Sequence, residues 1–148
     1  MRLLVQVVSR ASVTVDGETI GKIGNGYLIF AGFTDGDDEA VVDRLLDKCM
    51  TLRILPDENG KTNKSLADQN GSVLIISQFT LYADMKHGHR PSFTKALEPK
   101  RAEELYEYLL KKAAEYGRTV QHGKFGAEMH VDLCNEGPFT VMLDSAEM

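Results

Sequence analysis

The sequence predicts an α+β fold, in which a mostly antiparallel, barrel-like sheet is combined with two main helices. Seven or so segments have the alternating or continuous apolar pattern of strands, and two longer segments repeat apolar residues at helical spacing. The two kinds of segment occur in mixed order along 148 residues, without an internal repeat, a linker or a low-complexity stretch. A chain of this length can bury a sizeable core, so residues 1–148 are expected to form a single domain.

The strand segments are marked by apolar runs and by the turns between them. Residues 2–8 form a continuous apolar run, and residues 11–16 alternate before a hairpin turn at Asp16-Gly17. Further strands are expected at residues 18–23, 27–33, 53–55, 72–82, 127–133 and 139–143. A Gly-Pro turn separates the last two of these strands.

Two amphipathic helices are predicted from apolar residues that recur every three or four positions. The first spans residues 38–51 and follows cap candidates among the acidic residues of 35–38. The second begins at Pro99, a residue suited to the first turn of a helix, and ends before Gly117. Each helix therefore presents one apolar stripe.

Composition excludes several classes of protein. The formal net charge of −5 argues against a protein that coats nucleic acid through nonspecific attraction to phosphate. No apolar run approaches the ~20 residues of a membrane helix, and residues 1–8 are expected to be a strand rather than a signal peptide. Cys49 and Cys134 lack the spacing of a zinc site or a disulfide framework, so both are expected to be reduced, small apolar residues. We therefore expect a cytoplasmic protein with no metal and no cofactor.

A basic stretch lies between residues 86 and 101, with Glu98 as its only acid. Its cationic and imidazole side chains belong to Lys86, His87, His89, Arg90, Lys95, Lys100 and Arg101. The stretch is either a local patch that grips one RNA end or a solvated loop and helix start. The sequence leaves both interpretations open.

Two short segments carry the strongest functional signal, although each has an ordinary structural explanation. Ser77–Ala83 places polar residues where an apolar strand leaves the core, and backbone N–H groups at such a strand end can stabilise an oxyanion. Asn135–Thr140 contains the Gly137-Pro138 turn, whose glycine permits close approach and whose proline fixes the backbone. Taken alone, they are typical of a strand end and a structural turn.

Nucleophilic catalysis by Ser77 or Thr80 is not supported by the pattern. Such a hydroxyl needs an adjacent base, and no GxSxG elbow precedes Ser77. The chain has four histidines, but none is spaced to suggest a Ser-His-Asp arrangement.

Together, the two segments resemble the signature motifs of the D-aminoacyl-tRNA deacylase (D-tyrosyl-tRNA(Tyr) deacylase) family, which proofreads the chirality of the amino acid carried by tRNA. Three further segments are similar to family sequence in the same order: residues 10–17, residues 88–93 and residues 124–129. The resemblance covers essentially the whole chain. It implies an enzyme that hydrolyses the ester of D-aminoacyl-tRNA.

The resemblance also implies how the site is built. The family is a homodimer with active sites at the subunit interface, and a cis Gly137-Pro138 turn from one subunit would enter the partner's site. Its carbonyls would hold the α-amino group and leave no room for an L side chain. Substrate binding and chiral selection are expected from Gly137, Pro138, Phe125, Met129 and Asn135.

The catalytic segment implied by the resemblance comprises Ser77, Gln78, Phe79 and Thr80. It would line the pocket for the terminal adenosine and the ester of the aminoacyl-tRNA 3′ end. The N–H groups of Phe79 and Thr80 would stabilise the oxyanion, while the ribose 2′-hydroxyl of the RNA assists and the side-chain hydroxyls are dispensable. A site that works by steric exclusion cannot reject glycine, so activity on glycyl-tRNA is also expected.

One departure from the family pattern concerns Val7. The family commonly has arginine here, and that arginine is thought to hold the Gly-Pro turn, so the sequence leaves open what anchors the turn and how stringent it is. Two rival functions also remain: a noncatalytic dimer that binds an RNA end or a small ligand, and a general esterase that uses Thr80 or Ser77.

Overall fold

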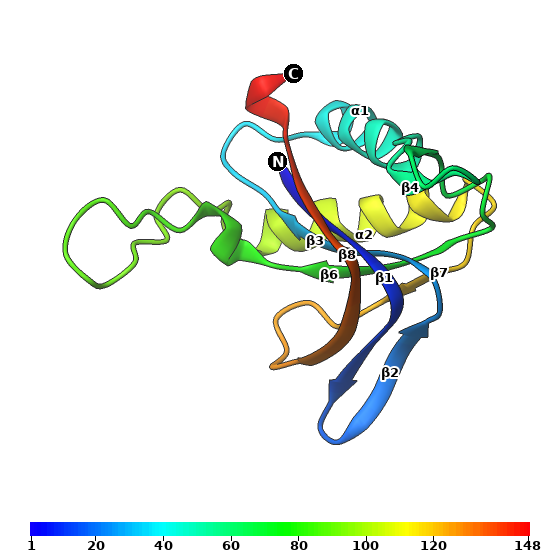
Figure 1. Ribbon diagram of the computed structural model, residues 1–148. Helices are drawn as coiled ribbons and strands as arrows, with labels where there is room; N and C mark the ends of the chain where they lie inside the picture. Colours follow the sequence, from blue (N-terminus) through cyan, green and yellow to red (C-terminus); the bar gives the residue numbers. More distant parts are fainter.

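A bent sheet and two helices make up the structure, a computed structural model that describes residues 1–148 (Figure 1). The main sheet has the strand order β2-β1-β3-β6-β7, and β8 pairs with β1. Its strands are β1 (Arg2–Val15), β2 (Glu18–Ile23), β3 (Gly26–Gly32), β6 (Ser72–Ser77), β7 (Val120–His122) and β8 (His130–Asp144). A separate two-stranded sheet joins β4 (Leu55–Pro56) to β5 (Thr62–Lys64).

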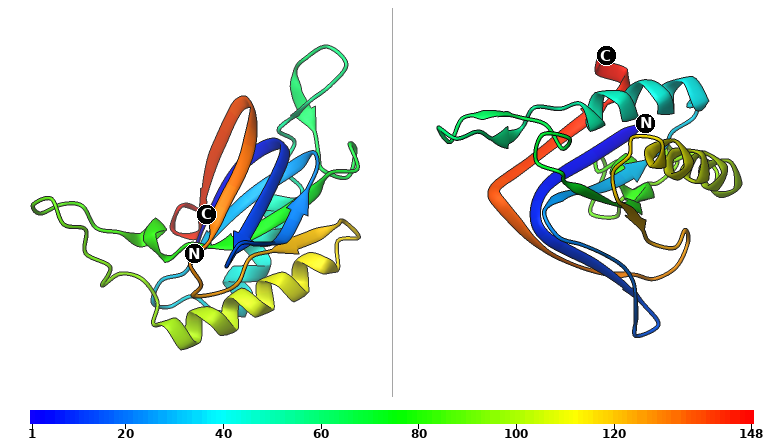
Figure 2. Two further views of the ribbon diagram at one scale, coloured as in Figure 1. Left: turned by 90° about the horizontal axis from the view of Figure 1, so that it is seen from below. Right: turned by 90° about the vertical axis from the view of Figure 1, so that its right-hand side faces the viewer.

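The longest strands lie at opposite ends of the sequence and pair with each other. β1 pairs along one edge with β3 and then β2, and along its other edge with β8. Figure 2 shows β1 and β8 curving together through a sharp bend. The C-terminal strand therefore lies beside the N-terminal one and gives the sheet its barrel-like shape.

The bend in β1 follows from a change in which side chains are buried. Leu3, Val5 and Val7 are buried in alternation, but Val8 is buried as well. The pairing of β1 with β8 shifts in register on both sides of Val8, as expected where a bulge bends a strand. The prediction of two strands at 2–8 and 11–16 was therefore wrong, because one bent strand covers both.

The predicted α+β class, with two helices and a barrel-like sheet, is confirmed, and the sheet proves to be mixed. β3 pairs with β6, and β6 pairs with β7, in parallel. Each parallel pair needs a crossover connection. Helix α1 (Glu39–Met50) lies between β3 and β6 in the chain, and α2 (Pro99–Ala114) lies between β6 and β7.

Side-chain caps fix the starts of both helices. The carboxylate of Asp38 accepts a hydrogen bond from the N–H of Val41, and that of Glu98 accepts one from Arg101. Each bond satisfies a donor that the first turn of a helix leaves free. The predicted span 38–51 agrees with α1 to within one residue at each end because these signals are local in sequence.

Two apolar clusters lie on opposite faces of the sheet. The larger packs α1 and α2 against alternate residues of the central strands, such as Tyr27, Ile29 and Ile75. The smaller contains Leu28 and Ile76 from the other face, together with residues from the second half of β1. Because the sheet bends over this second face, it is buried as well, which explains the continuous apolar runs of the central strands.

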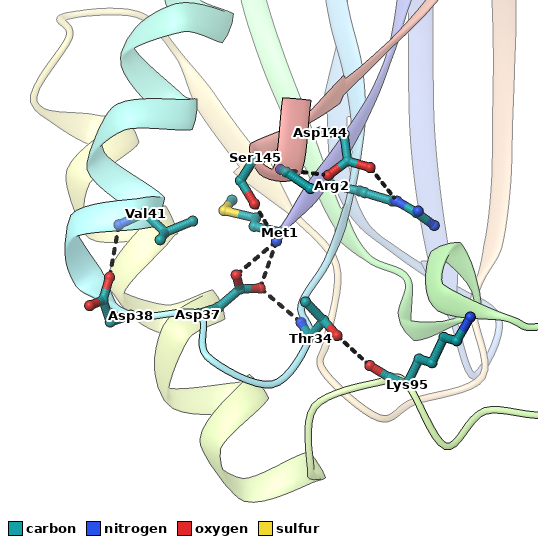
Figure 3. A network of polar contacts seen from close by, with 10 residues as sticks. Met1, Arg2, Thr34, Asp37, Asp38, Val41, Lys95, Asp144 and Ser145 are labelled. Carbon is teal, nitrogen blue, oxygen red and sulfur yellow. Dashed lines mark hydrogen bonds and ion pairs between the residues drawn. The ribbon is translucent and has the colours of Figure 1, made fainter. Parts of the chain in front are cut away.

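The ends of the chain are joined by polar contacts (Figure 3). The α-amino group of Met1 lies 2.7 Å from the carboxylate of Asp37 and donates to Ser145 Oγ at 2.9 Å. Beside it, Arg2 Nε donates to Asp144 Oδ2 at 2.9 Å. These contacts hold the last residues of β8 against the first residues of β1.

The two cysteines are free, as predicted, but their surroundings differ. Cys49 is fully buried in α1, and burial raises the pKa of its thiol to about 12. Cys134 is only half-buried, on β8.

None of the helices is both long and apolar enough to span a membrane.

Candidate functional site

A pocket of about 600 Å³ opens where β6 leaves the sheet. Its walls come from the ends of β3 and β6, the segment before α2, the first turn of α2 and the segment that leads into β8. Thirteen of its nineteen lining residues are apolar, as is typical of a site for a small organic group. The predicted residues among them are Ser77, Gln78, Phe79, Phe125 and Met129.

The floor of the pocket forms because β6 stops at Ser77. The prediction of a strand to residue 82 was wrong: Phe79–Tyr82 form a short 3₁₀ helix, η1. Gln78 has φ −148° and ψ 86° between the two elements, and its N–H donates to the carbonyl of Ala31 at 2.7 Å. The chain thus turns away from the sheet directly at the pocket.

The start of η1 leaves backbone donors available. The N–H groups of Phe79 and Thr80 have no partner inside so short a helix. Gln78, the preceding residue, makes no side-chain cap. Its amide nitrogen instead donates to Thr80 Oγ1 at 2.5 Å. The segment therefore leaves two adjacent N–H groups without a partner, one of them on Phe79, which lines the pocket, whereas Thr80 does not line it and its hydroxyl accepts from Gln78.

Close packing against β3 fixes the position of η1. A Cβ at Gly32 would lie 2.8 Å from the carbonyl oxygen of Gln78 and 3.0 Å from Leu81 Cβ. Only a residue without a side chain lets the two segments approach this closely. Gly32 thus sets the depth at which the Ser77–Thr80 segment sits in the pocket.

Two exposed aromatic rings stand at the mouth of the pocket. Phe79 is 56% exposed and Phe93 is 40% exposed. Their ring centroids are 5.0 Å apart, with an interplanar angle of 68°, the edge-to-face geometry that aromatic pairs prefer. Sequence reasoning placed Phe93 in a family motif but not in the site.

The pocket lacks the partners of a catalytic serine. Glu98 is its only titratable side chain, and that carboxylate already accepts from the N–H of Arg101 at 2.9 Å. His122 and His130 do not line the pocket. Ser77 lies at its wall without a histidine beside it. No group of three or more His, Cys, Asp or Glu side chains is placed to hold a metal ion.

The Gly-Pro turn lies elsewhere, in the middle of β8. The peptide bond between Gly137 and Pro138 is cis, as the resemblance implied. Both residues are exposed, and Gly137 has φ +128°, a conformation that favours glycine. The predicted strands at 127–133 and 139–143 are in fact one strand that carries the turn within it. Neither residue lines the pocket of its own chain.

The Asn135 side chain closes the base of this turn. Its Oδ1 accepts from the N–H of Phe139 at 3.0 Å, and its Nδ2 lies 3.1 Å from the carbonyl oxygen of Phe139. The same Nδ2 lies 3.2 Å from the carbonyl oxygen of Val7. Nearby, Gln6 Nε2 donates to Thr140 Oγ1 at 3.2 Å. Side-chain amides therefore tie the turn to β1 at the point where the family has arginine.

The structure thus brings the predicted residues together in two groups rather than one. Ser77, Gln78 and Phe79 meet Phe125 and Met129 at the pocket, and Thr80 lies beside them. Gly137, Pro138 and Asn135 form the separate turn. Sequence reasoning missed the part of the wall made by Ala96–Pro99, because nothing in that segment shows that it folds back onto β3, where Leu97 N–H donates to the carbonyl of Phe33.

Comparison with known proteins agrees with this architecture. A model of the D-Tyr-tRNA(Tyr) deacylase family matches residues 4–144. The chain is 48% identical to the D-aminoacyl-tRNA deacylase of Lactobacillus acidophilus over 97% of its length and 99% of that protein. It is 49% identical to the D-aminoacyl-tRNA deacylase of Clostridioides difficile over 99% of each. A solved structure described as c-Myc DNA Unwinding Element Binding Protein superposes with a TM-score of 0.91 at 36% identity, over 97% of this chain and 98% of that one.

These matches define the chain as a member of a family of deacylases. It belongs to the D-Tyr-tRNA(Tyr) deacylase family. The enzyme class predicted from the sequence, a hydrolase acting on D-aminoacyl-tRNA, is thereby confirmed.

Proposed function

We propose that this protein cleaves the ester between a D-amino acid, or glycine, and the terminal adenosine of tRNA, with a catalytic centre made of backbone groups. The observation that carries the proposal is the apolar pocket beside two uncapped N–H groups and without a base for Ser77. Hydrolysis of an activated ester needs a placed water and a stabilised oxyanion rather than a strong nucleophile. Action on charged tRNA would place the protein in the cytoplasm.

The chemical steps use the start of η1. Water adds to the ester carbonyl carbon, and negative charge develops on the carbonyl oxygen. The N–H groups of Phe79 and Thr80 donate to that oxygen in the tetrahedral intermediate. The bond between the carbonyl carbon and the ribose oxygen then breaks, and the ribose oxygen takes up the proton that the attacking water gives up, which leaves free amino acid and tRNA. The neighbouring 2′-hydroxyl of the ribose assists, which agrees with the absence of a histidine from the pocket.

We further propose that a second copy of the chain completes the site. The turn is exposed and lies outside its own pocket, so it can reach a pocket on another molecule. β8 also offers a free edge, since β1 is its only strand partner, and its side chains are at most half-buried. Pairing across this edge in a homodimer would cover the strand and insert the Gly137-Pro138 turn into the partner's site.

In this arrangement the turn selects the chirality of the substrate. Its carbonyls accept hydrogen bonds from the α-amino group of the bound amino acid. The turn then occupies the space that an L side chain needs, whereas a D side chain points away. Glycine has no side chain to exclude, so glycyl-tRNA is hydrolysed as well.

Asn135 holds the turn in this chain, where the family's arginine is absent. Its amide contacts both the far side of the turn, at Phe139, and the backbone of Val7. A bridge of this kind fixes the turn relative to β1 through backbone groups, so the side chain at position 7 is free to be apolar.

The central test is hydrolysis of three charged tRNAs. D-tyrosyl-tRNA and glycyl-tRNA are expected to be deacylated much faster than L-tyrosyl-tRNA by the same preparation. Equal rates on the D and L esters would contradict chiral selection. Binding without hydrolysis of any ester would instead favour a noncatalytic RNA-binding dimer.

A further inference from the structure

A second cavity, of about 650 Å³, lies beside the pocket and is lined by three cations that the proposed reaction does not use. They are Arg2, Lys86 and Lys95. The carboxylates of Asp35 and Asp84 also line it, which leaves a formal surplus of one positive charge. On a chain with a net charge of −5, such a surplus is a local exception.

The same two chain segments contribute to the cavity and to the pocket. Phe79 and Phe93 line the pocket, whereas Tyr82, three residues after Phe79, and Lys95, two residues after Phe93, line the cavity. η1 separates the two spaces, and four residues of 3₁₀ helix are about 8 Å long. A group bound in the pocket therefore lies close to the cavity.

Two of the cations that line the cavity, Arg2 and Lys95, are fixed by their neighbours. Arg2 is paired with Asp144, lies 4.5 Å from the centroid of the Tyr82 ring and donates to the carbonyl of Leu81 at 2.7 Å. Lys95 Nζ lies 3.2 Å from Asp84. The Thr34 hydroxyl donates to the carbonyl of Lys95 at 2.5 Å, which ties the loop to the body of the protein (Figure 3).

Two cations of the loop, Lys86 in the cavity wall and Arg90 four residues further along, are free of ion pairs. Lys86 and Arg90 are exposed, and neither forms an ion pair. Both belong to the long loop between η1 and α2, which projects from the body of the molecule (Figure 1). Unpaired cations on a projecting loop can contact phosphate without first giving up a carboxylate partner.

We infer that this cavity and loop bind phosphate groups of the RNA strand next to the terminal adenosine, with Lys86 and Arg90 as the main contacts. The inference rests on the proposed function, because it assumes that the pocket holds the adenosine end. Ammonium and guanidinium groups are the usual partners of phosphate. Contacts to the phosphates position a strand without reading its sequence, which suits an enzyme that acts on different tRNAs.

Binding of uncharged RNA tests the inference without relying on catalysis. The probe is a fluorescent RNA hairpin with a single-stranded 3′ end, titrated at several salt concentrations. The double variant Lys86→Gln/Arg90→Gln is expected to raise Kd about 4- to 25-fold, from a two- to fivefold loss per exposed charge contact. The slope of log Kd against log salt should fall by about 1.4, since each phosphate contact on a single strand contributes about 0.7.

The matched control removes one lysine and one arginine from the helices. The double variant Lys111→Gln/Arg44→Gln has the same net charge as the loop variant. Both residues are exposed, form no ion pair and line neither the pocket nor the cavity. Its Kd should change less than twofold. The inference would be overturned if both double variants weakened RNA binding equally. It would also be overturned if the loop variant, Lys86→Gln/Arg90→Gln, did not weaken RNA binding.

Hydrolysis of two different esters then tests whether Lys86 and Arg90 contact the phosphate-bearing part of the substrate. The loop variant should lower kcat/KM for D-tyrosyl-tRNA by the factor seen in Kd, but leave hydrolysis of D-tyrosyl-adenosine, which has no phosphate, unchanged. An equal loss on both esters would show damage to the pocket and count against the inference. Failure of the wild-type protein to hydrolyse either ester would refute the proposed function instead, while the RNA titration would still decide the phosphate contacts.

Discussion

The backbone groups of the pocket and those of the Gly-Pro turn are held in position by different kinds of interaction. At the pocket, the backbone of Phe79 and Thr80 is held by the packing of its neighbours, since Gln78 and Leu81 lie against Gly32 and η1 follows the buried strand β6. At the turn, Gly137 and Pro138 are exposed, and side-chain hydrogen bonds from Asn135 hold them. Packing defines the pocket within one chain, whereas the turn is preformed on the surface. The exposed, ordered turn therefore suits the role proposed for it in a second copy of the chain, whereas the pocket is complete in position within its own chain.

The largest loss of activity is expected from a substitution at Gly137, because the proposed selection of D substrates depends on the conformation of the turn. In Gly137→Ala, the added Cβ would lie 2.9 Å from the backbone nitrogen of Phe139, at φ +128°. A displacement of about 1 Å at a positioning group can cost about 100-fold in rate, so kcat/KM for D-tyrosyl-tRNA should fall by about that factor. The measurement is steady-state deacylation, together with urea unfolding.

The matched control for this variant is Gly60→Ala. Gly60 also has a positive φ, but a Cβ there meets nothing within 4 Å. Both substitutions should cost about 1–2 kcal/mol of stability through the left-handed backbone, yet only Gly137→Ala should lose activity. If Gly137→Ala kept full activity, the turn would have no role in the proposed mechanism.

Gly32 tests the pocket in the same way. Gly32→Ala places a Cβ 2.8 Å from the carbonyl oxygen of Gln78, so η1 must shift. Overpacking of this kind costs about 1–3 kcal/mol, and activity on D- and L-esters should fall together because the oxyanion donors move. Gly24→Ala, which meets nothing within 4 Å and has an ordinary φ, should behave as wild type. If Gly32→Ala changed the ratio of activities on the D- and L-esters, the assignment of chiral selection to the turn alone would be contradicted.

Asn135 links the turn to β1, and two substitutions separate its roles. Asn135→Asp keeps an acceptor for the N–H of Phe139 but loses the donor to the carbonyls of Phe139 and Val7. Asn135→Ala loses both. Each lost hydrogen bond is worth about 0.5–1.5 kcal/mol, and in Asn135→Asp a carboxylate oxygen also faces the carbonyl oxygens of Phe139 and Val7, so both variants should lower D/L selectivity. Unchanged selectivity in both variants would show that another group anchors the turn.

The hydroxyls of the pocket should matter least for catalysis. Removing the nucleophile of a serine hydrolase costs about 10⁶-fold in kcat, whereas Ser77→Ala and Thr80→Ala should each cost less than about tenfold if the backbone supplies the oxyanion donors. A loss of several orders of magnitude in either variant, with intact folding by circular dichroism, would favour nucleophilic catalysis.

The smallest effect concerns the anchored end of β8 and its response to acid. Burial alone would raise the pKa of Asp144, but the N–H of Ala146 and the guanidinium of Arg2 lower it below the ordinary value of 3.8. A lowered folded-state pKa stabilises the fold above the unfolded pKa, and this contribution is lost as the pH falls through the folded pKa. Asp144→Asn should therefore lower stability near pH 7 and weaken its fall below pH 4, as measured by urea unfolding. An unchanged pH profile would contradict the pairing.

The sequence predicted features whose causes are local and missed those that depend on distant contacts. The bounds of α1 followed from its caps and apolar spacing. The bend at Val8 depends on register with β8, and the parallel pairing of β3 with β6 depends on where the crossover helix packs. Likewise, the Ser77–Phe79 part of the site was predictable from the motif. The Asn135 bridge to Val7 was not, because hydrogen bonds between residues far apart in sequence leave no local pattern.

The pairing of β1 with β8 also governs when the protein can become functional during its synthesis. Until the last strand leaves the ribosome, one edge of the first strand has no partner. The wall of the pocket that contains Val131 is also missing. Pairing between opposite ends of a chain is slow compared with helix formation, because a long loop must close first. We therefore expect the nascent chain to form its helices early and to acquire the complete pocket only in a final step, when its two ends meet.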